Sequence, residues 1–286
     1  MNKLWIALWM VALVGCNTPT QNNSHTIRIK GSESMISTFE ALKWDFEQSQ
    51  DSIKIQLEGG GSRTGLEGVG EGTIDIGMSS FEFNVDSIYP GQSIKTKRVA
   101  FDGIVVILNE KNLLSTLSNA DIRDIYTGRI TNWNELGGSD GEILPIVRDE
   151  NSGTQRFFKE YFGLDVISAK ALVAENNNQI SEKVATDVNA IGYMGYGYFT
   201  DLVTPCGLEF VNQAGDTLFL PPNRAHLESG EYPLKRGLFV YHKEETQANT
   251  AFMTYLNSPA ARKIISNFGL IVESGSQSGA NSPAIR

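Results

Sequence analysis

The chain has 286 residues, of which 41% are hydrophobic and 20% charged, so it can bury a sizeable core and is not expected to be disordered. Its 33 acidic residues outnumber the 24 basic ones, and the formal net charge is −9. Nucleic acid is therefore not an expected partner, because binding a phosphate backbone needs clustered Lys and Arg. The three His and two Cys are scattered and fit no typical zinc or thiol site, so we expect no metal and no cofactor.

The first sixteen residues predict an export signal. Lys3 precedes eleven apolar residues, 4–14, which are too few to span a bilayer, since a transmembrane helix needs about 20. The ending Leu13-Val14-Gly15-Cys16 resembles a bacterial lipobox. That resemblance implies a signal peptide over 1–15, cleavage before Cys16 and a lipid on its thiol. The alternative is an ordinary signal peptide with a chance Cys.

The segment after Cys16 is polar and has no hydrophobic period, which predicts a flexible tether over 16–25. With a lipid on Cys16, Cys206 has no partner, so no internal disulfide is expected. Residues 274–286 are rich in Ser and Gly and predict a loose tail.

Strand and helix patterns alternate along the rest of the chain, which predicts an α/β fold. Strands are expected where apolar residues alternate or run together, at 26–30, 53–57, 74–78, 99–108, 143–147 and 234–241. Helices are expected where apolar residues recur at helical spacing, at 35–46, 62–69, 119–126, 152–162, 179–188 and 246–268. The strand at 99–108 is long enough to cross between lobes. An aromatic cluster at Tyr193, Tyr196, Tyr198 and Phe199 is interpreted as packing rather than as a sugar-stacking platform.

Three segments place Ser, Thr or Gly between a strand and a helix, namely 31–34, 59–65 and 148–154. A helix start has unpaired backbone N–H groups and a positive dipole end, and glycine lets an anion approach them closely. Hydroxyl groups add further donors. The three segments together favour a site for a tetrahedral anion, with Arg148 placed to add a bidentate guanidinium. Taken singly, each segment is more typical of a plain helix cap or turn.

These segments resemble the phosphate-binding proteins of bacterial phosphate ABC transporters. Residues 148–154 fit that family's Arg-x-x-x-Ser-Gly-Thr motif, and the likeness extends from residue 26 to about 269. It implies a two-lobed type II periplasmic-binding-protein fold, with a ligand cleft between lobes joined by two crossing strands. Lobe I would comprise 26–102 and 236–286, and lobe II would comprise 103–235. Three further matching segments, 120–133, 190–199 and 232–241, are interpreted as scaffold without ligand contacts.

The resemblance also implies a set of phosphate-binding residues. They are Ser34, the backbone amide of Met35, Ser62, Ser80, Arg148, Ser152, Gly153 and Thr154. The chain departs from the family at Ser80, where well-known members have an Asp that accepts a hydrogen bond from protonated phosphate. Glu33, Glu82 or Asp149 is a possible substitute for that Asp, although each is more typical of a solvated surface acid. Arg63 is a possible second cation, and a surface position is equally typical of it.

The function that follows is an extracytoplasmic, lipid-anchored binding protein that captures inorganic phosphate and delivers it to an ABC permease. The family implies a monomer. The alternatives are a receptor for sulfate, molybdate or tungstate, or a phosphate-binding scavenger or sensor without a permease. A phosphate-ester hydrolase is disfavoured, because no Gly-x-Ser-x-Gly elbow is present and Ser152 has no evident His partner. We therefore do not expect an enzyme.

Overall fold

The computed structural model describes residues 25–211, 215–243 and 246–272. The predicted signal peptide, Cys16, the tether up to residue 24 and the tail at 274–286 lie outside the described residues. The tether is predicted to reach His25, whereas the first strand already includes this residue, whose amide donates to the Ser52 carbonyl (2.9 Å). None of the helices in the described part of the chain has the length and apolar character needed to cross a membrane.

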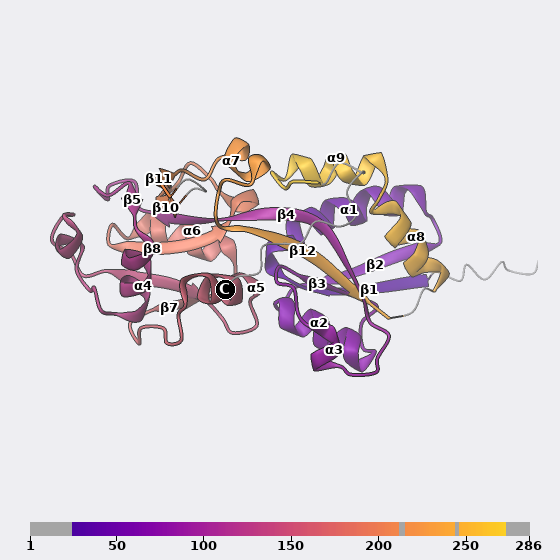
Figure 1. The fold of residues 1–286 in the computed structure, drawn as a ribbon. Coiled ribbons are helices and arrows are strands. Elements are labelled where there is room, and N and C mark those ends of the chain that lie inside the picture. Colours follow the sequence, from indigo (N-terminus) through magenta and orange to yellow (C-terminus); the bar gives the residue numbers. More distant parts are fainter. Residues whose placement is uncertain (1–24, 212–214, 244–245, 273–286) are drawn as a thin grey trace, which may run out of the picture.

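One half of the molecule is built on three parallel strands in the order β2-β1-β3. These strands are β1 (His25–Gly31), β2 (Ile53–Glu58) and β3 (Ile76–Ser79), linked by α1 (Ile36–Ser49) and α2 (Ser62–Glu71). The two helices lie on opposite faces of the sheet (Figure 1). Because the strands are parallel, their carboxyl ends share one edge, which is where ligands bind in open α/β sheets.

Two long antiparallel strands join this half to the other. β4 (Lys95–Leu108) pairs with β12 (Lys235–His242) along residues 95–103 and with β8 (Ala190–Gly195) along residues 104–108. In Figure 1 both strands run side by side between the two halves. The protein therefore has the mixed α/β, two-lobed architecture with crossing strands that the sequence predicted.

The second half repeats the parallel arrangement with β6 (Leu144–Arg148), β7 (Leu172–Ala174) and β8 (Ala190–Gly195). Helices α4 (Asn119–Thr127) and α5 (Gly153–Phe162) cover one face, and α6 (Asn177–Thr186) covers the other. Side chains of β4 alternate between the two cores, since Val106 packs with α4 and α5 whereas Val105 packs with α6. A strand buried on both faces is a continuous apolar run, as this one is.

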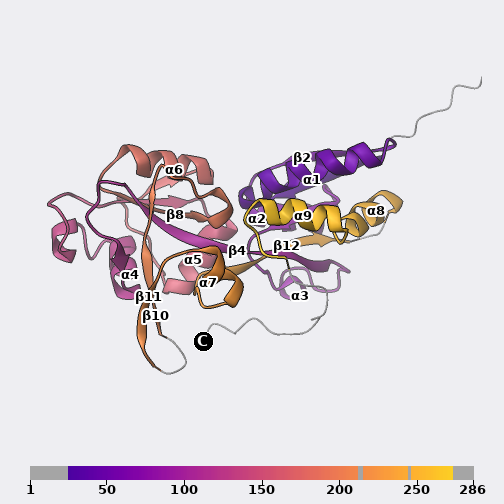
Figure 2. The same cartoon turned by 90° about the horizontal axis from the view of Figure 1, so that it is seen from above.

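The remaining elements are short. They are η1 (Glu33–Met35), α3 (Val85–Ile88), β5 (Thr116–Leu117), η2 (Trp133–Leu136), η3 (Tyr196–Tyr198), β9 (Thr204–Pro205), β10 (Gly207–Val211), β11 (Thr217–Leu220), α7 (Arg224–Ser229), α8 (Gln247–Tyr255) and α9 (Pro259–Asn267). Figure 2 shows β10 and β11 as a hairpin that projects from the second half.

Two differences between the predicted and observed segments have a clear local cause. The helix expected over 246–268 is two helices, α8 and α9, because Pro259 cannot continue a helix and Ser258 caps the next one, accepting from the Ala261 amide (3.1 Å). The strand expected at 74–78 begins at Ile76, since the amide of Ile74 still bonds to Gly68 in the turn after α2. Tyr193 lies in the core and stacks on Phe158, with ring centroids 3.8 Å apart, as the packing interpretation expects.

Candidate anion-binding site

The hydroxyl groups of Ser34 and Thr154 meet where the two halves face each other. Ser34 lies in η1, directly after β1, and Thr154 lies in the first turn of α5. Their oxygen atoms are 3.0 Å apart, and both residues are buried. Two segments that are far apart in the sequence, 31–34 and 148–154, therefore contact each other through the side chains expected to bind an anion.

A second group of hydroxyls lies beside them in the first half. Ser62 begins α2, and its Oγ accepts a hydrogen bond from the Ser80 amide (3.0 Å) and lies 3.4 Å from the Ser80 Oγ. The Ser32 hydroxyl donates to the Ser80 Oγ (3.0 Å). All three residues are buried. Sequence reasoning selected Ser62 and Ser80 but not Ser32, which lies in the same Gly-Ser-Glu-Ser turn as Ser34.

The start of α5 lies against this second group, and only glycine fits there. A Cβ atom at Gly153 would lie 2.3 Å from the Ser62 Oγ and 2.8 Å from the Ser80 Oγ. The first amides of a helix have no acceptor inside it, and this end carries partial positive charge. The amides of Gly153 and Thr154 are therefore available as donors next to the buried hydroxyls of Ser62 and Ser80.

Two of the predicted site residues have other partners in the structure. The Ser152 hydroxyl is the N-cap of α5 and accepts from the Gln155 amide (3.3 Å), which is the plain capping role. The Met35 amide donates to the Ser32 carbonyl (3.0 Å) and so holds the turn of η1. Both residues are buried at the site, and their local bonds shape the loops that carry Ser34 and Thr154.

The Arg148 guanidinium is buried at the end of β6. Its Nε donates to the Ala174 carbonyl (3.0 Å), and its Nη2 lies 3.4 Å from the Asp149 carboxylate. Burial lowers the pKa of Arg148 from its usual value, while the nearby carboxylates of Asp149 and Glu33 oppose that shift. Because an arginine pKa starts so high, the side chain keeps its charge at neutral pH. Arg148 therefore brings a positive charge into a region of low dielectric.

A second buried arginine, Arg236 on β12, contacts the hydroxyls directly. Its Nη1 donates to the Thr154 Oγ1 (2.7 Å) and its Nη2 to the Ser34 Oγ (3.2 Å), so one guanidinium bridges the two halves. The same Nη2 forms an ion pair with the Asp102 carboxylate on β4 (2.8 Å). Arg236 lies in the segment 232–241, which is interpreted from the sequence as scaffold, and the structure places it in contact with two of the predicted site residues.

Asp102 and Asn177 complete the surroundings of Ser34. The Asn177 amide group donates to the Ser34 Oγ (3.5 Å) and accepts from the Gly195 amide (3.4 Å). Sequence reasoning missed Asp102, Asn177 and Arg236. A signal was present for Asp102, because it is the one charged residue in the otherwise apolar run 99–108, and such residues are rarely fully buried unless they are paired.

The three acids considered as substitutes for the family's Asp at position 80 do not belong to the cluster of buried hydroxyls. The Glu33 carboxylate accepts from the Gly60 amide (2.7 Å) and holds the Gly-rich loop in place. Glu82 is exposed, and the side chain of Asp149 is 38% exposed beside Arg148. Arg63 is 62% exposed and pairs with Glu67, so it is a surface residue rather than a second cation of the site.

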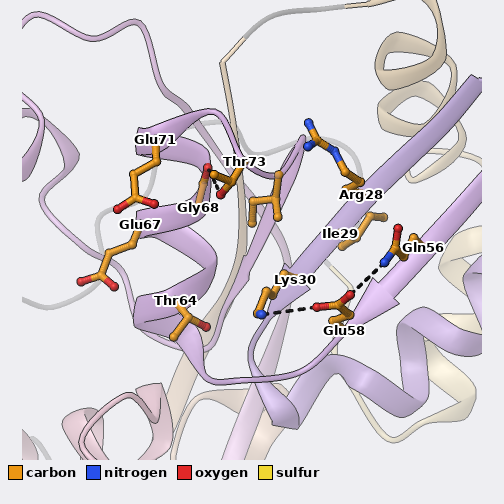
Figure 3. Close-up of a pocket in the computed structure, with 11 residues that line it drawn as sticks. Arg28, Ile29, Lys30, Gln56, Glu58, Thr64, Glu67, Gly68, Glu71 and Thr73 are labelled. Atoms are coloured by element: carbon orange, nitrogen blue, oxygen red, sulfur yellow. Dashed lines mark hydrogen bonds and ion pairs between the residues drawn. The ribbon is translucent and has the colours of Figure 1, made fainter.

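A groove on the outer side of the first half has a volume of about 440 Å³ and is lined by residues of β1, β2 and α2 (Figure 3). Its lining carries charges of both signs. Lys30 pairs with Glu58 inside the groove (3.3 Å), whereas Arg28 and Glu67 pair with residues outside its lining. Among the described residues, no group of three or more His, Cys, Asp and Glu side chains is placed to hold a metal ion.

Comparison with known proteins identifies the family. A model of the PBP superfamily domain matches residues 17–260. The phosphate-binding protein PstS of Bacillus subtilis is 30% identical over 244 residues, which is 85% of this chain and 78% of that protein. The chain belongs to the PstS family of the PBP superfamily. This is a family of transport substrate-binding proteins and not of enzymes.

Solved structures similar to this PstS-family chain agree in fold. A putative phosphate ABC transporter substrate-binding protein with bound phosphate from Clostridium perfringens superposes with a TM-score of 0.79 at 28% identity, covering 87% of this chain and 100% of the other. An ABC-type phosphate transport receptor from Vibrio cholerae superposes with a TM-score of 0.71 at 25% identity, with the same coverage.

Proposed function

We propose that this protein captures inorganic phosphate outside the cytoplasm and delivers it to an ABC permease. The observation that carries the proposal is the buried contact of Ser34 and Thr154, from opposite halves, around the Arg236 guanidinium. Hydroxyl, amide and guanidinium donors converging in a dry place are what a small tetrahedral anion requires. The PstS family and its phosphate-bound relative support the same ligand.

The proposed site comprises Ser34, Met35, Ser62, Ser80, Arg148, Ser152, Gly153 and Thr154, and we add Arg236. In the structure the hydroxyls of Ser34 and Thr154 contact each other, so the two halves must separate before an anion can enter. Movement about β4 and β12 would part Ser34 from Thr154 and admit the anion, and closure would trap it. In a closed site of low dielectric the charged hydrogen bonds are stronger than at the surface.

Phosphate is favoured over the other oxyanions by the family, whereas Ser80 keeps a sulfate receptor as the second candidate. Calorimetry separates them. The protein would be unfolded and refolded without phosphate to remove bound anion, and then titrated with phosphate at pH 7 with and without excess sulfate. We expect one phosphate per chain and no effect of sulfate. Binding abolished by sulfate, or seen only with another oxyanion, would change the transported ion.

The membrane attachment is a separate part of the proposal, and it rests on the lipobox-like residues ending at Cys16. We propose a lipid on the Cys16 thiol, a monomeric protein held at the membrane surface, and docking on the permease. Labelling cells with radioactive palmitate tests the anchor. The wild-type protein should carry the label and sediment with membranes, whereas Cys16→Ser should do neither. A labelled Cys16→Ser protein would show that the lipid is attached elsewhere.

A further inference from the structure

The ion pair of Asp102 and Arg236 uses only some of the polar atoms of the two side chains. Both side chains are almost completely buried, with 2% and 1% of their areas exposed. Asp102 Oδ2 accepts from Arg236 Nη2, but among the described residues Asp102 Oδ1 and Arg236 Nε have no hydrogen-bond partner. A buried polar atom without a partner costs free energy, most of all on a charged group. The pair therefore presents one vacant acceptor and one vacant donor.

The ion pair lies next to the proposed site. Asp102 and Arg236 are direct partners in the antiparallel register of β4 and β12, so the backbone holds their side chains together. Arg236 Nη2 reaches both Asp102 and the Ser34 Oγ. Asp102 Oδ2 also faces the Gly195 backbone, where a Cβ would lie 2.7 Å away. The carboxylate is thus one guanidinium away from a hydroxyl of the site.

A carboxylate acceptor beside a guanidinium donor discriminates between oxyanions by their protonation state. A fully deprotonated tetrahedral anion such as sulfate has only acceptors and would be repelled by a buried carboxylate oxygen. A protonated anion such as hydrogenphosphate carries one O–H donor, which satisfies a carboxylate, together with oxygens that satisfy a guanidinium N–H. Ser80, by contrast, is a hydroxyl that both donates and accepts, so it cannot exclude sulfate by charge.

We propose that the Asp102–Arg236 pair is the specificity determinant of the site. Arg236 binds the anion, and the Asp102 carboxylate accepts the hydrogen bond from the proton of the bound oxyanion. The carboxylate that the sequence lacks at Ser80 is thus supplied from β4. This inference rests on the proposed phosphate function and adds two residues that sequence reasoning did not select.

Asp102→Asn tests the assignment. The amide oxygen can keep the bond from Arg236, while its NH₂ group replaces the vacant acceptor with a donor that suits sulfate as well as phosphate. Affinities for phosphate and for sulfate would be measured by calorimetry at pH 7 on anion-free protein. We expect the ratio of phosphate to sulfate affinity to fall about tenfold or more in Asp102→Asn, since a hydrogen bond to a charged group is lost.

The matched control is Asp149→Asn, which removes a carboxylate beside Arg148 that is part-exposed; we expect its affinity ratio to equal that of the wild type. If Asp102→Asn lacks the circular dichroism and cooperative melting of the wild type, Asp102→Ser is measured in its place. An unchanged ratio in the folded variant overturns the assignment while the proposed function stands. A wild-type protein that binds sulfate as tightly as phosphate also overturns it. Absence of phosphate binding by the wild type would instead contradict the proposed function itself.

Discussion

Arg236 and Asp102 lie opposite each other on the two strands that join the halves, and their side chains form a buried ion pair with an N–O distance of 2.8 Å. The same guanidinium donates to Ser34 of one half and to Thr154 of the other. One side chain thus links the connecting strands to both walls of the site. Stability and binding should depend on it in different ways.

Arg236→Gln should destabilise the protein strongly, because it leaves the Asp102 carboxylate buried without its counter-ion. Removing one partner of a buried pair costs about 3–5 kcal/mol. The double variant Arg236→Gln/Asp102→Asn buries no charge and should regain most of that free energy of unfolding. Urea denaturation without phosphate measures both, and neither variant should recover wild-type phosphate affinity. A single variant as stable as the wild type would mean that water reaches the pair in solution.

Arg148→Ala should weaken phosphate binding by about 10- to 150-fold, the range for a lost hydrogen bond to a charged group. Arg63→Ala is the control, because Arg63 is 62% exposed and its ion pair with Glu67 is a surface one. Calorimetry with phosphate should find Arg63→Ala within about twofold of the wild type. Equal losses in the two variants would place Arg148 outside the anion's reach.

Gly153→Ala should impair binding through closure rather than through folding. The new methyl group would sit 2.3 Å from the Ser62 Oγ when the halves are together, and it meets no such obstacle once they part. We expect phosphate affinity to fall about tenfold or more, since a clash forces the buried donors apart, while urea denaturation without phosphate changes little. Wild-type affinity in this variant would show that α5 stays away from Ser62 in the bound form.

The two halves also meet at the rim of the site, where the Arg156 guanidinium of α5 lies over the rings of Phe81 (4.5 Å) and Phe83 (5.2 Å). Exposed cation–π contacts contribute about 0.5–1 kcal/mol. Arg156→Ala should therefore weaken phosphate binding by about two- to fivefold, because the closed form loses a contact that the open form lacks. Arg129→Ala, which removes a 58% exposed arginine paired with Asp124, serves as the control and should bind normally. Identical affinities for both variants would mean that the ring contact persists in the open form.

Ionisation of the Cys206 thiol should lower the free energy of unfolding at alkaline pH. Burial raises the pKa of its thiol to about 12 from 9.0, so the folded protein holds the thiol proton more tightly than the unfolded chain. Its contribution is fully present below the unfolded pKa and is lost as pH rises toward 12. In a Cys16→Ser background the thiol should resist alkylation at pH 8 until denaturant is added. Rapid labelling of the native protein would show that the second half opens around Cys206.

Much of the secondary structure could be predicted from residues that are close together in the sequence. The apolar alternation of β1 and β2, the helical spacing after residue 35 and the capping Ser152 depend on neighbouring residues, and the structure places these elements as predicted. The three loops rich in Ser and Gly could also be predicted, because the end of a strand and the cap of the following helix lie within a few residues of each other. The break at Pro259 was equally local and was overlooked.

The charged pair could not be found in this way. Asp102 and Arg236 are 134 residues apart, and they meet only because β4 and β12 pair antiparallel in one register. A charged residue within an apolar strand does not reveal which side chain will compensate it. The sequence by itself determined β1, β2, β4, β6 and β12, the helices that follow the three loops, and the hydroxyl groups those loops carry, because these features depend on neighbouring residues. The tertiary structure decided which cation and which carboxylate stand beside those hydroxyls, because burial and strand register are properties of the whole fold.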